Sequence, residues 1–256
     1  FGRTINAGLI IAIAGIIFSI CFDSFNDLIA GLRNGQEYVG YFFSNAAFGG
    51  MCTHYMLPVF TALPFSVSLC QERNNKAVSY IVSREGKNRY IFAKFIVSTI
   101  SGGFVAACGT VLLFLMLAMR FPIAGDEFEG AVVSDYFHEW SAVYYPQLYI
   151  LTLSILAFCR GVIWSSLALC VSLYTSDFMV VLLSPFLGSY VLVRIFQIIR
   201  VPDMVRPDMI LIGQVVIKSS GLTLLIAIAI SLTIVTLIGA FFVGKMKEGL
   251  KSGTIY

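Results

Sequence analysis

Long apolar blocks alternate with short polar segments along nearly the whole chain. Six blocks carry few enough charges, and are long enough, to cross about 30 Å of hydrocarbon as helices. They are predicted at residues 5–22, 48–69, 91–119, 148–173, 178–193 and 219–243. The fourth block contains Arg160 and the fifth is short, so these two are the least regular. The pattern predicts an all-α membrane protein with six transmembrane helices.

Composition supports a lipid environment. Hydrophobic residues make up 58% of the chain and charged residues 12%, with a mean hydropathy of +0.88, whereas an ordinary soluble domain has about 25% charged residues. We therefore expect a multi-pass protein of the cell membrane, in a bacterial plasma membrane, with membrane lipid as a partner. The net charge of +3 is small and no basic stretch is interleaved with aromatics, which argues against nucleic acid.

The beginning of the sequence predicts a retained first span. Residue 1 is Phe, so we expect the true N-terminus to lie upstream. The first apolar block is followed by Asp23 without a cleavage site of small residues, which disfavours a removed signal peptide.

The distribution of Lys and Arg predicts the orientation. Residues 70–94 contain six basic residues and residues 245–251 add three lysines, whereas residues 121–146 contain none and carry five acidic residues. Because basic loops stay on the cytoplasmic side, both termini and the 70–90 loop are predicted to be cytoplasmic. The basic connection 194–218 is predicted to form short amphipathic or re-entrant pieces at the outer interface, where its side chains snorkel.

Residue patterns typical of catalysis are not found in the sequence. It has no phosphate-binding G-x-x-x-x-G-K-[ST] loop, and its two histidines, His54 and His138, belong to neither an H-E-x-x-H nor a G-x-S-x-G pattern. The six cysteines are scattered singly, without the spacing of a metal site. We therefore expect no enzyme activity, no cofactor and no metal in this chain.

The predicted cytoplasmic loop changes character half way along. Residues 71–76 are polar, and 77–82 are mostly apolar. One interpretation is a short helix that exposes an apolar patch to a groove on a cytosolic partner, ended by Gly86, which permits a turn back into the third span. The alternative is an ordinary basic loop on anionic headgroups.

The order of features in this loop resembles the permease subunits of ABC-2-type transporters. Glu72 is followed by the short helix 76–82, by Ser83-Arg84 with Gly86, and by the basic stretch 89–94 that opens the third span. A tight turn at 172–177 that leads to Pro185 in the fifth span also resembles that family. The resemblance covers nearly the whole chain.

This resemblance implies a type V exporter-like transmembrane domain, in which ATP and Mg are bound by separate ATPase subunits. It implies a second permease, identical or related, and a coupling site for the ATPase. The short loop and the lack of a large soluble domain favour a separately encoded permease over a fused half-transporter. The residues matched to the coupling site are Glu72, Lys76, Val78, Tyr80, Ile81, Val82 and Arg84.

Three residues within the predicted spans are candidates for the pathway or the subunit interface. A charge at the centre of a span costs about 2.5 kcal/mol or more unless it is paired or hydrated, so Arg160 is expected to face one of these. The other interpretation is that the helix breaks near 159–161 and leaves Arg160 at the outer surface, beside an acidic residue of 126–139. His54 is expected to be hydrogen-bonded in a helix contact, and Pro185 to bend its helix.

The expected function is that of a membrane-spanning permease in an ATP-driven exporter of a hydrophobic or amphipathic compound or peptide. An ion-coupled secondary transporter or a channel is the alternative, although no Asp or Glu falls inside a predicted span. A sensor or assembly subunit without a transport path is a third reading.

Overall fold

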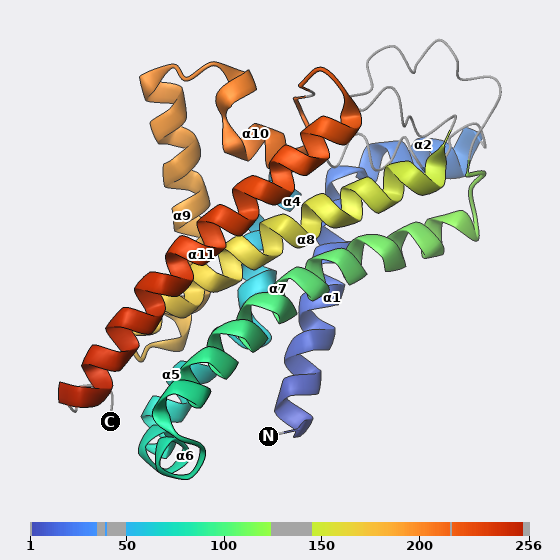
Figure 1. The fold of residues 1–256 in the computed structure, drawn as a ribbon. Helices are drawn as coiled ribbons and strands as arrows, with labels where there is room; N and C mark the ends of the chain where they lie inside the picture. The colour runs from blue at the N-terminus through green and yellow to red at the C-terminus, as the bar shows by residue number, and fades with distance from the viewer. Residues whose placement is uncertain (1, 35–38, 40–49, 124–144, 216, 253–256) are drawn as a thin grey trace.

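The computed structural model describes residues 2–34, 39, 50–123, 145–215 and 217–252, and within these ranges its regular elements are helices. Figure 1 shows the helices side by side in one bundle. They are α1 (Gly2–Asp23), α2 (Phe25–Asn34), α4 (Met51–Ala62), α5 (Ser68–Asn74), α6 (Ala77–Glu85), α7 (Lys87–Ala118), α8 (Pro146–Val171), α9 (Phe178–Ile199), η4 (Asp203–Val205), α10 (Pro207–Ile212) and α11 (Ser220–Ser252).

Four of the described helices, α7, α8, α9 and α11, are long and apolar enough to cross a membrane. They correspond to the third, fourth, fifth and sixth predicted spans. The first prediction falls on α1, whose apolar part, Ala7–Asp23, is shorter. The all-α membrane class is therefore supported by four helices rather than by the six that we expected.

The second predicted span, 48–69, is not one helix. Helix α4 ends at Ala62, residues 63–67 form a turn, and α5 begins at Ser68. The break lies at Pro64, which has no N–H to donate and whose ring crowds the preceding turn. Pro58 is tolerated inside α4, so the two prolines have different effects.

The fifth and sixth predicted spans end earlier than the helices that correspond to them. Helix α9 continues past Val193, and Arg194 lies on its surface with its guanidinium over the Tyr190 ring and bonded to Gln197. It ends at Ile199, and the next residue, Arg200, has a left-handed conformation and is followed closely by Pro202. Helix α11 runs on to Ser252 and carries a Lys245–Glu248 ion pair on its surface.

Small residues let α7 and α8 approach closely, and these two helices share the most extensive packing in the described bundle. A Cβ atom placed on Gly161 of α8 would lie 2.6 Å from the carbonyl oxygen of Gly102 on α7. Small residues at a helix contact permit a close approach of this kind.

The start of α1, the end of α11, α5 and α6 lie at one end of the bundle, called here the α6 end (Figure 1). Helices α2 and α10 lie at the other, called the α10 end. The basic residues of the 70–90 segment and of the end of α11 are thus brought together, as the orientation prediction requires. The short elements η4 and α10 occupy the connection in which interfacial or re-entrant pieces were expected.

Candidate functional site

Arg160 is the fifteenth of the 26 residues of α8. The helix is unbroken through Cys159 and Gly161, so the predicted alternative of a break at this point is wrong. At this point Gly161 lies against the backbone of α7. Arg160 is therefore a buried residue, 9% exposed, and does not lie at a helix end.

The guanidinium of Arg160 makes no hydrogen bond or ion pair with any residue that the structure describes. Its exposed part opens instead into cavities within the bundle. The acidic segment 126–139, once considered as its partner, lies outside the described residues. A buried cation without a counterion is the most unusual electrostatic feature of the described chain.

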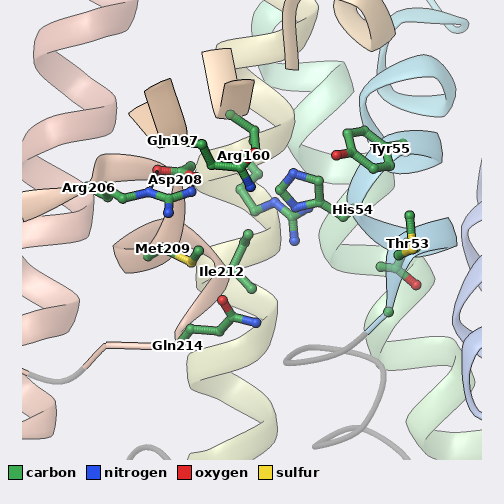
Figure 2. Close-up of a pocket in the computed structure, with 13 residues that line it drawn as sticks. Thr53, His54, Tyr55, Arg160, Gln197, Arg206, Asp208, Met209, Ile212 and Gln214 are labelled. Carbon is green, nitrogen blue, oxygen red and sulfur yellow. Dashed lines mark hydrogen bonds and ion pairs between the residues drawn. The ribbon is translucent and has the colours of Figure 1, made fainter. Parts of the chain in front are cut away.

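The first cavity next to Arg160, of about 180 Å³, is the more polar of two and is called here the polar cavity (Figure 2). His54 of α4 lies beside the arginine, and Gln197 of α9 and Gln214 also contribute to the wall. Thr53 lines the same cavity, and its buried Oγ1 has no hydrogen-bond partner within the described ranges. The Thr53 hydroxyl is therefore a polar group of the cavity wall that is left unused within the described ranges.

Arg206 and Asp208 close one side of this cavity. Arg206 is only 5% exposed, and its Nη2 lies 2.7 Å from Asp208 Oδ2 while its Nη1 lies 3.2 Å from Asp203 Oδ1. The hydrogen bond that Arg206 donates to Asp208 raises the pKa of Arg206. We expected this arginine to snorkel at the outer interface, but the two aspartates allow it to turn inward. As a consequence, the Asp208 carboxylate is already occupied and does not neutralise Arg160.

A second cavity, of about 170 Å³, shares Arg160, His54 and Asp208 with the first but is otherwise mostly apolar. It lies between α8, α9 and α11. The residues that give it this character are Ile163, Trp164, Leu167, Gly188, Leu192, Ile234 and Ile238. Arg160 therefore lies between the polar cavity and a mostly apolar one.

His54 is positioned by the start of α4. The carboxylate of Asp23, at the end of α1, accepts hydrogen bonds from the backbone N–H groups of Cys52 and Thr53 at 3.0 and 2.6 Å. This satisfies donors that a helix start leaves free. The sequence placed Asp23 only at the end of the first apolar block, and no local pattern indicated its contact with the start of α4.

The His54 ring makes an aromatic contact rather than the expected hydrogen bond. It lies edge-on to Tyr55, with ring centroids 4.7 Å apart, and no bond from the ring to another described residue is found. Tyr55 contacts Phe186 and Tyr190, which joins α4 to α9. Pro185 is buried inside α9, which continues through it, and it lines neither of the two cavities.

Glu72 links two elements at the α6 end. It is 7% exposed on α5, and it accepts hydrogen bonds from Tyr90 Oη at 2.5 Å and from Lys94 Nζ at 2.6 Å, both on α7. The sequence singled out Glu72 and the basic stretch 89–94 but not this contact. The pair ties the predicted coupling segment to a membrane helix.

Arg73 links α5 to a second part of the chain, the turn between α8 and α9. Its Nη1 donates to the carbonyl oxygens of Ser172 at 2.9 Å and Leu173 at 3.2 Å, in the turn between α8 and α9. The neighbouring Asn74 donates to the carbonyl of Ser176 at 3.1 Å. These bonds connect the two parts of the chain that carried the family resemblance.

Helix α6 forms as predicted, but its apolar residues divide between two faces. Val78 is fully buried and Val82 nearly so, within a cluster that includes Leu69, Ile91 and Phe242. Ile81 is half-buried and packs against the same cluster. The patch expected to meet a partner is therefore smaller than the sequence suggested.

The outer face of α6 carries Tyr80, which is 70% exposed, together with the exposed Arg84. Lys76 is exposed at the start of the helix, where its φ of 53° makes the bend after α5. Gly86 ends α6 with a φ of 85° and begins α7, which confirms the predicted turn. A left-handed conformation of this kind favours glycine.

Comparison with protein-family models, with curated proteins and with solved structures finds no match for this chain. Within the described residues no group of three His, Cys, Asp or Glu side chains is arranged to hold a metal ion. The inference of function therefore depends on the geometry of the Arg160 cavities and of the α5–α6 segment.

Proposed function

We propose that this chain is the membrane-spanning permease subunit of an ATP-driven ABC transporter of the ABC-2 type. In this proposal it pairs with a second permease, and separate ATPase subunits bind ATP and Mg. Its cargo is a hydrophobic or amphipathic compound or peptide that is exported. The α6 end is cytoplasmic, in agreement with the basic residues gathered there.

The observation that carries this proposal is the anchoring of α5 and α6. A part that transmits movement must be held firmly to the helices that it moves while keeping one face free for its partner. Glu72 holds α5 to α7, and Arg73 holds it to the α8–α9 turn. On α6, meanwhile, Tyr80 and Arg84 remain exposed.

The buried face of α6 makes the same connection by packing. Val78 and Val82 belong to an apolar cluster that also contains residues of α7, α8 and α11, three of the four described helices long enough to span a membrane. A displacement of α6 by a partner is therefore passed to several spans at once. Rigid movement of packed elements between two arrangements is a common basis for such coupling.

Affinity purification from native membranes in mild detergent tests the proposal. The wild type is compared with Tyr80→Asp, which places a charge on the exposed face of α6. We expect the wild type to recover an ATPase in stoichiometric amount and the variant to lose most of it, while both insert into the membrane equally well. Tyr145→Asp is the matched control, because Tyr145 is also exposed but precedes α8, away from α6.

Val78→Asp separates a docking defect from a folding defect. Since Val78 is buried, a charge there should lower the amount of folded permease itself, unlike Tyr80→Asp. Recovery of no nucleotide-binding partner by the wild type across several detergents would contradict the proposal. Flux driven by an ion gradient in reconstituted vesicles without ATP would then favour the secondary transporter.

A further inference from the structure

The described residues do little to offset the free-energy cost of burying the Arg160 charge in the middle of an apolar helix. Burying a charge is tolerated when it is paired, hydrated or offered to a ligand. The described residues provide no pair, and the opening of the side chain is toward the two cavities. The site therefore has room for a counterion at the guanidinium.

The carboxylates near the polar cavity are paired with Arg206 and not with Arg160. Two arginines, Arg160 and Arg206, and one aspartate, Asp208, line the cavity, so its lining carries an excess of one positive charge. Asp208 is bonded to Arg206, and the mostly exposed Asp203, which does not line the cavity, also pairs with Arg206. An anion is thus the group that this cavity is best suited to receive.

The second cavity requires that the ligand also have apolar surface. It begins at Arg160 and extends between α8, α9 and α11 past Trp164, Leu192 and Ile238. A ligand that meets both walls needs an anionic head and an apolar chain. A planar guanidinium suits a carboxylate or phosphate head because its N–H groups form a fork of matching geometry.

We propose that Arg160 binds the anionic head of an amphiphile whose apolar chain occupies the cavity lined by Trp164. Gln197 and the unused hydroxyl of Thr53 supply further polar groups around the head. The amphiphile is either a free compound or a bilayer lipid with an anionic headgroup. The binding site stands independently of the transporter proposal. Only the further statement that the amphiphile is the exported cargo rests on the proposed function.

Quenching of Trp164 fluorescence tests the site directly. The chain contains two tryptophans, so Trp140→Phe leaves Trp164 as the single reporter. The protein is placed in phosphatidylcholine nanodiscs without any ATPase and titrated with dodecanoate brominated at its terminal carbon. We expect saturable quenching, and much weaker quenching by the equally brominated dodecyl trimethylammonium.

Arg160→Gln removes the charge and should raise the concentration needed for half-maximal quenching about tenfold or more. Arg120→Gln is the matched control, since Arg120 is exposed at the end of α7 and lines neither cavity. Gly188→Leu tests the mostly apolar cavity independently. A Cβ atom at Gly188 would lie 3.2 Å from the Trp164 ring, so the larger side chain should fill the cavity and weaken quenching with Arg160 intact.

A second set of measurements, with brominated lipids, identifies the source of the ligand. If brominated phosphatidylglycerol quenches Trp164 more than brominated phosphatidylcholine, in an Arg160-dependent way, and dodecanoate does not displace it, the amphiphile is a membrane lipid. If dodecanoate displaces it, the site accepts free anionic amphiphiles. Equal quenching by the anionic and cationic probes, or no change in a folded Arg160→Gln protein, would overturn the inference. These readouts need no ATPase, so their failure is distinct from failure of the transporter proposal.

Discussion

Lys94 Nζ on α7 lies 2.6 Å from Glu72 Oε1 on α5, and both side chains are largely shielded from solvent. The second carboxylate oxygen of Glu72 accepts a hydrogen bond from Tyr90. A short helix that follows a proline break is thereby fixed to the longest described helix but one. This contact therefore joins α5 to α7 at the α6 end.

Glu72→Gln should destabilise the protein markedly. The substitution leaves the ammonium of Lys94 buried without its counterion, and breaking a buried pair in this manner costs about 3–5 kcal/mol. Thermal unfolding of the purified protein in nanodiscs measures the loss. Glu248→Gln is the control, since it removes an exposed ion pair on α11 and should leave the unfolding temperature nearly unchanged.

The double variant Glu72→Gln with Lys94→Met checks that reason. Because it removes both charges, it should recover much of the stability that Glu72→Gln loses. If the two substitutions instead add their separate losses, the ion pair is not what stabilises this contact.

Arg73→Gln should weaken coupling more than assembly. It removes the bonds to the carbonyls of Ser172 and Leu173 but leaves the exposed face of α6 unchanged. We expect the variant to recover a normal amount of ATPase while transport per ATP hydrolysed falls severalfold. Arg89→Gln, an exposed residue at the start of α7, is the matched control. Equal transport by the two variants would show that the link from α5 to the α8–α9 turn transmits no movement.

The sequence predicted the position of α6 and its final glycine but not the direction that its residues face. Val78 and Val82 are four residues apart and lie on one side of a helix, and that spacing indicated a single apolar face. Whether such a face meets a partner or the rest of the chain depends on long-range packing. Here it meets Leu69, Ile91 and Phe242, which no local pattern connects to it.

The two arginines of the cavity show a similar contrast. Arg160 was found because a charge inside an apolar block is conspicuous. Arg206 was assigned to a surface because its segment contains several charges, and the partner that allows its burial, Asp208, is recognised only in three dimensions. The alternation of Asp203, Arg206 and Asp208 around Pro207 was the available signal.

Gly161→Ala should disturb the contact between α7 and α8. The added methyl group would meet the carbonyl oxygen of Gly102 at 2.6 Å, so the two helices must separate. We expect a loss of about 1–3 kcal/mol, measured as a lower unfolding temperature. Gly244→Ala is the control, because nothing lies within 4 Å of its Cβ position and an alanine in an exposed helix is favourable by about 0.5–1 kcal/mol. A Gly161→Ala protein as stable as Gly244→Ala would contradict the close approach.

The charge balance of the polar cavity predicts opposite effects of changing Arg206 and Asp208. Arg206→Gln releases the Asp208 carboxylate, which shares the cavity with Arg160 and should then compete with an anionic ligand. Asp208→Asn instead removes a negative charge and leaves both arginines. Relative to the wild type, we expect brominated dodecanoate to bind more weakly to Arg206→Gln and at least as tightly to Asp208→Asn.

The double variant, Arg206→Gln with Asp208→Asn, removes the pair and retains Arg160. The excess of one positive charge is then restored, so binding should return toward that of the wild type, as measured by Trp164 quenching in the Trp140→Phe background. Arg206→Gln alone should also lower the unfolding temperature, because it leaves a carboxylate buried without its partner. Binding that follows the unfolding temperature of each variant, rather than the charge of its cavity, would show that the Arg206 pair supports the fold and does not tune the site.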